Sequence, residues 1–166
     1  NIELMRDNKA QFAILQGLYG SSAWTCAGPL DGPRKELRSI TMLWQNVEHF
    51  IIPADKAKTG TIADMLALKG ERMSFGIKNS GALSSNELLL ANLGINMEKD
   101  YQLFSVGYDP SADALQDGRI SGMSTPGGVP VSAVTRAMTQ LGDKVTLLGF
   151  TEEEAKKADG GHGLWT

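Results

Sequence analysis

The stretch KGERMSFGIKNSGALSSNE, residues 69–87, most constrains the fold, because it predicts a strand that turns directly into a helix. The apolar run at residues 72–77 leads through a Gly/Asn/Ser turn into a helix that opens with Ser80, Gly81 and Ala82. The first amide N–H groups of a helix have no partner within it, and the aligned peptide dipoles place partial positive charge there. Because the side chains are small, this turn is suited to hold a carboxylate or a phosphate.

The same residues are also typical of ordinary helix capping. Asn79 or Ser80 is a good N-cap residue, and a strand-to-helix turn with such a cap needs no ligand. No Walker lysine follows the turn, and the chain contains no G-x-G-x-x-G motif, which argues against nucleotide binding. Anion binding and simple capping both remain open from the spacing alone.

Apolar runs alternate with helical segments along most of the chain. Short, nearly continuous apolar runs predict strands at residues 11–16, 38–44, 47–53, 72–77, 101–106, 120–124 and 144–150. Cap and turn residues predict helices at residues 61–68, 82–93, 111–118, 130–141 and from Thr151 onward. This alternation predicts an α/β fold with a mostly parallel sheet and flanking helices.

Residues 37–52 break the alternation, because two apolar runs are separated only by Gln45 and Asn46. A tight hairpin is one interpretation, although Gln-Asn is a weak two-residue turn. The other interpretation, which we favour, is one extended passage that leaves one sheet and enters a second.

Composition excludes several classes of function. A net charge of -3 without a basic run argues against a nucleic-acid partner. Cys26 is the only cysteine, and His49 and His162 have no metal-ligand spacing, so no metal site or other cofactor is expected. His49 lies inside an apolar strand and is expected to be structural. No apolar run is long enough to span a bilayer, so direct membrane insertion is not expected.

The segments FAILQ (residues 12–16), TIADMLALKGERMSFG (61–76) and NSGA (79–82) occur in this order. Together they resemble the TAXI class of extracytoplasmic solute receptors, which serve TRAP-type secondary transporters. Residues 12–16 (FAILQ) are similar to the family's strand that ends in a ligand-facing glutamine. Residues 61–76 (TIADMLALKGERMSFG) resemble its DL-K-G-K-R-V-x-x-G pattern. Residues 79–82 (NSGA) fall where the family has a G-S-G-T anion-binding turn, with Ala82 in place of the threonine. The resemblance covers roughly residues 12–150.

The resemblance implies an α/β fold of the type II periplasmic-binding-protein kind, in which two lobes close on a small ligand. It assigns residues 1–46 to a remnant of the first lobe, residues 47–142 to the second lobe and residues 143–166 to a return segment towards the first lobe. The chain is then expected to be a fragment without its signal peptide. The resemblance further implies a non-catalytic periplasmic receptor that passes a carboxylate, such as glutamate, glutamine or a dicarboxylate, to TRAP membrane subunits.

The expected ligand-binding residues gather in two segments and one isolated position. Asn79, Ser80, Gly81 and Ala82 form the anion-binding turn, with Gln16 as a further polar contact. The glycine-rich loop STPGGVP allows close approach of a ligand at Thr125, Gly127 and Gly128. The alternatives are that Gln16 is only the polar end of a strand, and that the loop is a plain turn before a helix.

Two other functions compete with the receptor. An enzyme on a similar two-lobed fold, such as a transferase, would use the turn for phosphate, but we find no concentrated set of Arg, Lys or acidic residues and expect no catalytic residue. The effector domain of a transcription regulator shares this general architecture, but residues 1–10 do not resemble a DNA-binding module.

Overall fold

A computed structural model describes residues 2–25, 32–161 and 163 of the chain. These residues divide into two compact units, unit 1 (Asn1–Trp44) and unit 2 (Gln45–Thr166), which we describe separately. Cys26 and His162, considered above, lie outside the described residues.

Unit 1 contains two helices, α1 (Ile2–Arg6) and α2 (Gly17–Thr25), among its described residues. The strands predicted at residues 11–16 and 38–44 are wrong, since neither segment has regular secondary structure. A strand needs a hydrogen-bonded neighbour, and no described residue of unit 1 pairs with either segment. For the same reason neither a hairpin nor a first sheet forms around Gln45 and Asn46.

Unit 2 contains all the strands assigned in the described residues: β1 (Phe50–Pro53), β2 (Arg72–Met73), β3 (Gln102–Leu103), β4 (Met123–Ser124) and β5 (Val145–Leu147). Each lies inside a segment predicted as a strand. Strands β4, β1 and β5 form one ladder, and β2 and β3 form another. A bridge between Ser74 and Met123 joins the two, so the strands follow the order β3-β2-β4-β1-β5.

One strand of this sheet runs against the other four. Strand β2 is parallel to β3 and, through the Ser74–Met123 bridge, to β4, whereas β1 is antiparallel to both β4 and β5. Four of the five strands therefore run in one direction, as the prediction of a mostly parallel sheet requires, and β1 is the reversed strand. Hydrophobic runs record burial but not direction, which is why the sequence did not reveal the reversal.

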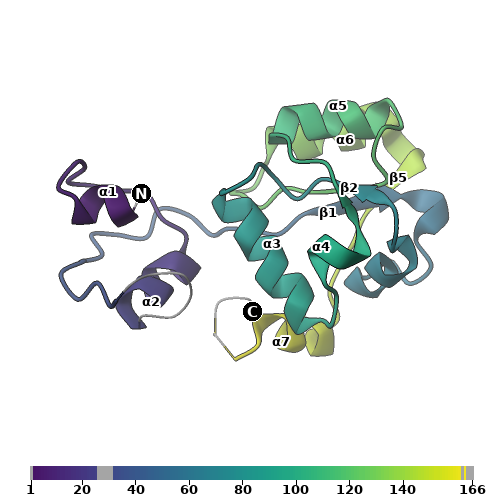
Figure 1. Ribbon diagram of the computed structural model, residues 1–166. Coiled ribbons are helices and arrows are strands. Elements are labelled where there is room, and N and C mark those ends of the chain that lie inside the picture. Colours follow the sequence, from purple (N-terminus) through teal and green to yellow (C-terminus); the bar gives the residue numbers. More distant parts are fainter. Residues whose placement is uncertain (1, 26–31, 162, 164–166) are drawn as a thin grey trace. The chain divides into compact units, whose positions relative to one another are not determined.

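Helices cover both faces of the sheet. The α-helices of unit 2 are α3 (Gly81–Asn92), α4 (Met97–Asp100), α5 (Tyr108–Gln116), α6 (Ser132–Leu141) and α7 (Glu152–Asp159). The 3-10 helices of its described residues are η1 (Ala54–Lys56), η2 (Ile62–Leu68) and η3 (Gly142–Lys144). Helices α5 and α6 lie side by side against one face, as Figure 1 shows.

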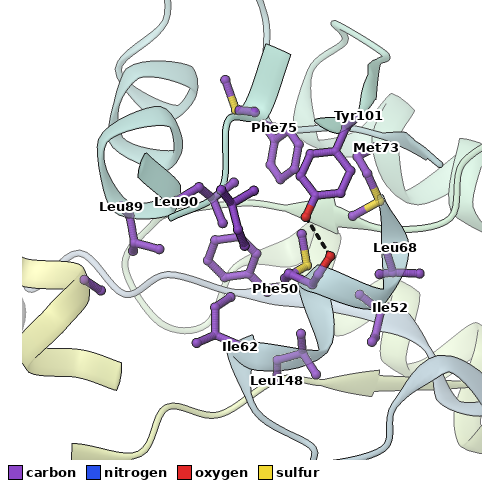
Figure 2. Close-up of a cluster of buried hydrophobic side chains, with 14 residues drawn as sticks. Phe50, Ile52, Ile62, Leu68, Met73, Phe75, Leu89, Leu90, Tyr101 and Leu148 are labelled. Carbon is purple, nitrogen blue, oxygen red and sulfur yellow. Dashed lines mark hydrogen bonds between the residues drawn. The ribbon is translucent and has the colours of Figure 1, made fainter. Parts of the chain in front are cut away.

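The sheet separates two hydrophobic cores. Alternate residues of β1 point to opposite faces, so Phe50 and Ile52 belong to one core and Ile51 to the other. Figure 2 shows the first core, where Phe50 is surrounded by apolar side chains from η2, β2 and α3. The Tyr101 hydroxyl donates a hydrogen bond of 2.7 Å to the Met65 carbonyl there, and burial raises its pKa well above the usual value. The second core lies beneath α5 and α6.

Side-chain caps account for several helix starts. Thr61 is the N-cap that the sequence predicted, although the helix it begins is 3-10 rather than α. Thr151 begins α7 with a capping box, in which Glu154 accepts from the Thr151 backbone N–H at 2.7 Å. Helix α5 begins three residues before the predicted Ser111, and α6 begins two residues after Pro130.

The described part of residues 143–166 belongs to unit 2. Strand β5 pairs with β1, and the Asn92 side chain of α3 donates to the Ala158 carbonyl of α7 at 2.8 Å. Trp165 lies outside the described residues. No helix within the described ranges has the length and apolar content that a membrane span requires.

Candidate functional site

Three helices of unit 2 begin at one edge of the sheet. Helix α3 follows β2, α5 follows β3 and α6 follows β4, and these three strands run in the same direction. Their carboxyl ends therefore lie at a common edge, together with the amino end of the reversed strand β1. Because each helix N-terminus carries partial positive charge, the three dipoles favour an anion at this edge.

The start of α3 keeps two main-chain donors unused. Ser80 is its N-cap, and the Ser80 hydroxyl accepts from the Leu83 N–H at 3.1 Å. The Ser80 N–H donates to the Ile77 carbonyl at 3.2 Å, which closes the turn. The N–H groups of Gly81 and Ala82 have no acceptor among the described residues. These two amides are the donors that the sequence analysis identified.

The turn before α3 requires unusual backbone conformations. Asn79 has a φ of 61°, in the left-handed region that asparagine tolerates better than most residues. Gly76 has a φ of 109°, and a Cβ there would lie 3.1 Å from both the Ala82 Cβ and the Ser80 Oγ. A glycine at position 76 therefore lets the end of β2 pack closely against the first turn of α3.

The second predicted segment is fixed to the start of β1. The Thr125 N–H donates to the His49 carbonyl at 3.1 Å, and the His49 Nδ1 lies 3.0 Å from the Thr125 carbonyl. Gly127 forms an antiparallel bridge with Val47. The buried His49 is thus structural, as predicted. Thr125 is fully buried, and its hydroxyl has no hydrogen-bond partner in the described part of the chain, whereas Gly127 and Gly128 are half-buried.

Three residues of this edge escaped the sequence analysis. The Ser85 hydroxyl of α3 donates to Glu48 Oε1 at 2.6 Å, and the Tyr108 hydroxyl of α5 donates to the Pro126 carbonyl at 2.6 Å. Burial, with a smaller contribution from the Glu48 charge, raises the pKa of Tyr108 to about 12. Both hydrogen bonds join residues that are far apart in the sequence, so no local sequence motif predicts them.

The structure brings most of the predicted site residues to the same edge. Residues 79–82 and 125–128 both follow carboxyl ends of parallel strands, and the Glu48–Ser85 bond and the Val47–Gly127 bridge connect both segments to the start of β1. Gln16 belongs to unit 1, where its carbonyl accepts from the N–H groups of Tyr19 and Gly20 at the start of α2. Its side chain remains a candidate from the sequence alone.

A hollow of about 460 Å³ adjoins the turn before α3. Its lining comes from the turn, from α3 and α4, and from the end of β3: Lys78, Asn79, Leu83, Glu98, Leu103 and Ser105. The described residues contain no cluster of three or more His, Cys, Asp or Glu side chains arranged to hold a metal ion. The edge therefore offers main-chain donors and a shallow cavity.

The sequence model of the NMT1-like family matches residues 1–166. The chain belongs to the NMT1-like family. No curated protein matches this NMT1-like chain. The expected fold class, an α/β lobe of the type II periplasmic-binding-protein kind, is confirmed.

Thirty-two chains of solved structures also match the NMT1-like chain. The alkanesulfonate-binding protein SsuA from Xanthomonas axonopodis pv. citri, bound to MOPS, is 26% identical with a TM-score of 0.44, over 70% of this chain and 34% of that chain. An ancestral arginine-binding protein bound to glutamine is 14% identical with a TM-score of 0.43, over 65% and 42%.

An amino acid ABC transporter substrate-binding protein from Streptococcus pneumoniae, bound to L-arginine, is 16% identical with a TM-score of 0.42, over 65% of this chain and 39% of that chain. The NMT1-like chain thus spans less than half the length of each of these three proteins.

Proposed function

We propose that this chain contributes to a solute-binding receptor that binds a small carboxylate and catalyses no reaction. One observation carries the proposal: the free N–H groups of Gly81 and Ala82 lie at an edge where three helices begin. Such donors bind an anion without a charged side chain, which suits a receptor that must also release its ligand. Membership of the NMT1-like family supports the same conclusion.

The finer parts of the proposal come from the sequence resemblance. The receptor is periplasmic, its ligand is glutamate, glutamine or a dicarboxylate, and it delivers that ligand to the membrane subunits of a TRAP transporter of the TAXI type. Residues 1–46 belong to the first lobe of the full receptor, residues 47–142 form the second, and residues 143–166 lead back towards the first. In this proposal Ser80, Gly81 and Ala82 contact the carboxylate, with Asn79, Gln16, Thr125, Gly127 and Gly128 as further ligand-binding residues.

A transferase is the weaker alternative, for a specific reason. The serines near the turn are already engaged, since Ser80 caps α3 and Ser85 donates to Glu48. Neither hydroxyl is paired with a histidine in the described residues, and His49 is occupied by Thr125. An assay of phosphorylated substrates with the purified chain should show no turnover, and measurable turnover would support the transferase instead.

The substitution Gly81→Pro tests the proposal. Gly81 is the first residue of α3, where proline fits well, and the extended conformation of Ser80 suits a residue before proline. This change removes one N–H donor while the helix remains. The control, Gly81→Ala, keeps the N–H and adds only a methyl group.

We would measure binding of L-glutamate, L-glutamine and succinate to the chain by calorimetry. At least one should bind saturably, Gly81→Ala should bind it within about threefold of the wild type, and Gly81→Pro should bind it about tenfold more weakly, or 1.4 kcal/mol. Equal binding by Gly81→Pro and Gly81→Ala, or no binding of any carboxylate to the wild type, would contradict the proposal.

A further inference from the structure

The hollow beside the turn before α3 is built to hold more than an isolated carboxylate. Its volume of about 460 Å³ falls in the range of small-molecule sites, roughly 300–1,000 Å³. Asn79 of the turn and Leu83 of α3 line it, and the Gly81 and Ala82 donors lie between these two residues in the sequence. All of its lining belongs to unit 2.

Two residues of opposite charge, from different parts of the chain, line this hollow. Lys78 follows the carboxyl end of β2, whereas Glu98 lies in α4, which precedes the amino end of β3. Neither side chain forms an ion pair within the described ranges, although Lys69 and Asp100 nearby pair at 2.9 Å. Lys78 and Glu98 are therefore available to a ligand, and they offer it charges of opposite sign.

Two leucines give the same hollow an apolar surface. Leu83 on the first turn of α3 is half-buried, and Leu103 on β3 is 37% exposed. Strand β3 ends the sheet, with β2 as its only neighbour in the described residues, so no further strand covers Leu103. An apolar stem laid over the two leucines would remove this surface from water.

We propose that the hollow selects a zwitterionic ligand, an acid with a terminal amine on a short apolar chain. The acid group binds the Gly81 and Ala82 amides with the Lys78 ammonium nearby. The chain lies on Leu83 and Leu103, and the terminal ammonium meets the Glu98 carboxylate. This inference rests on the proposed function, because it places the acid group at the same anion site. Among small carboxylates it favours acids with a terminal amine over the glutamate, glutamine and dicarboxylates that the resemblance implies.

Three matched probes test the selection: hexanoate, 6-aminohexanoate and adipate. All carry one carboxylate for the anion site, and they differ at the far end by a methyl, an ammonium or a second carboxylate. We expect 6-aminohexanoate to bind the wild-type chain about fivefold tighter than hexanoate, a modest factor because Glu98 is exposed. Adipate should bind more weakly than 6-aminohexanoate.

Two variants test whether the Glu98 carboxylate causes the preference for 6-aminohexanoate. Glu98→Gln should abolish the preference for 6-aminohexanoate while hexanoate binds as before. Glu87→Gln, which removes an exposed carboxylate of α3 outside the hollow, should keep the preference. A preference that survives Glu98→Gln, equal binding of hexanoate and 6-aminohexanoate, or tighter binding of adipate would overturn the inference.

The failure of this inference can be told apart from failure of the proposed function. If all three acids bind equally and Gly81→Pro weakens each of them, the anion site stands and only the zwitterion selection is wrong. If none of the acids binds, the anion site itself is wrong and the inference falls with it.

Discussion

Units 1 and 2 carry apolar sequence in similar patterns, yet only unit 2 uses it to build a sheet. In unit 1, apolar residues of these runs such as Phe12 and Met42 are 77% and 89% exposed, and their segments form no strand. In unit 2, Phe50 is fully buried between η2, β2 and α3. The difference shows that an apolar run becomes a strand only where a neighbour pairs with it and a helix covers it.

The largest expected effect comes from removing the centre of the first core of unit 2. Phe50→Ala deletes a fully buried ring that also packs edge-on against Phe150 with centroids 6.2 Å apart. The lost burial and the remaining cavity should lower the free energy of unfolding of unit 2 by about 3–5 kcal/mol, measured by urea denaturation. A loss below about 1 kcal/mol would show that this core does not hold the sheet together.

The carboxylate of Asp64 should contribute less, about 2 kcal/mol at pH 7. It accepts hydrogen bonds from the N–H groups of Lys58, Thr59 and Gly60 at 2.8–3.0 Å. Burial opposes ionisation of Asp64, but these bonds outweigh it and lower the pKa of the carboxyl below its usual value. Asp64→Asn removes the charge and should therefore lower the free energy of unfolding of unit 2. Urea denaturation at a series of pH values measures this loss.

The pH dependence gives the sign of this contribution. Because the pKa of Asp64 is lower in the folded state, its stabilisation is complete above the unfolded value of about 3.9 and is lost as pH falls through the folded value. The difference between wild type and Asp64→Asn should therefore be constant from pH 7 to about pH 5 and shrink below about pH 4. Asp143→Asn, which changes an exposed carboxylate of η3, serves as the control. A difference that persists unchanged to pH 2 would contradict this account.

The N-cap of α7 should matter at the level of about 1 kcal/mol. Thr151→Ala removes the acceptor for the Glu154 N–H and breaks the capping box. The matched control is Thr139→Ala, because Thr139 is exposed in the last turn of α6 and caps nothing. Urea denaturation should separate the two variants, and equal stability would show that this cap contributes nothing to the stability of unit 2.

The smallest effect is expected in unit 1. Phe12→Ser changes a largely exposed side chain, so the free energy of unfolding should move by less than about 0.5 kcal/mol. This result would sharpen the comparison with Phe50→Ala. A loss above about 1 kcal/mol would break it, because Phe12 would then be packed against other residues in solution.

The sequence predicted the strands of unit 2 well and those of unit 1 poorly, for one physical reason. Apolar runs such as residues 47–53 report a capacity for burial, and in unit 2 that capacity is met by pairing partners more than seventy residues away. Residues 11–16 and 38–44 have the same capacity without a partner in the described chain. The direction of β1 was also beyond prediction, because burial is the same whichever way a strand runs.

The sequence likewise predicted one part of the candidate site and missed another. The N-cap at Ser80 and the unbonded N–H groups of Gly81 and Ala82 follow from the local sequence, so the geometry of this turn was predicted correctly. Glu48, Ser85 and Tyr108 reach the same edge only through the fold, and no spacing in the sequence reveals them. Whether a ligand binds there remains a prediction.

A titration of the ¹⁵N-labelled chain with L-glutamate, followed by amide NMR, tests the central claim most directly. Binding of the carboxylate to α3 should shift the Gly81 and Ala82 amide resonances saturably and more strongly than those of Ser132 and Ala133 at the start of α6, a helix without a side-chain cap. If glutamate saturates the chain while the Gly81 and Ala82 resonances stay in place, or if no resonance moves at all, the account is contradicted.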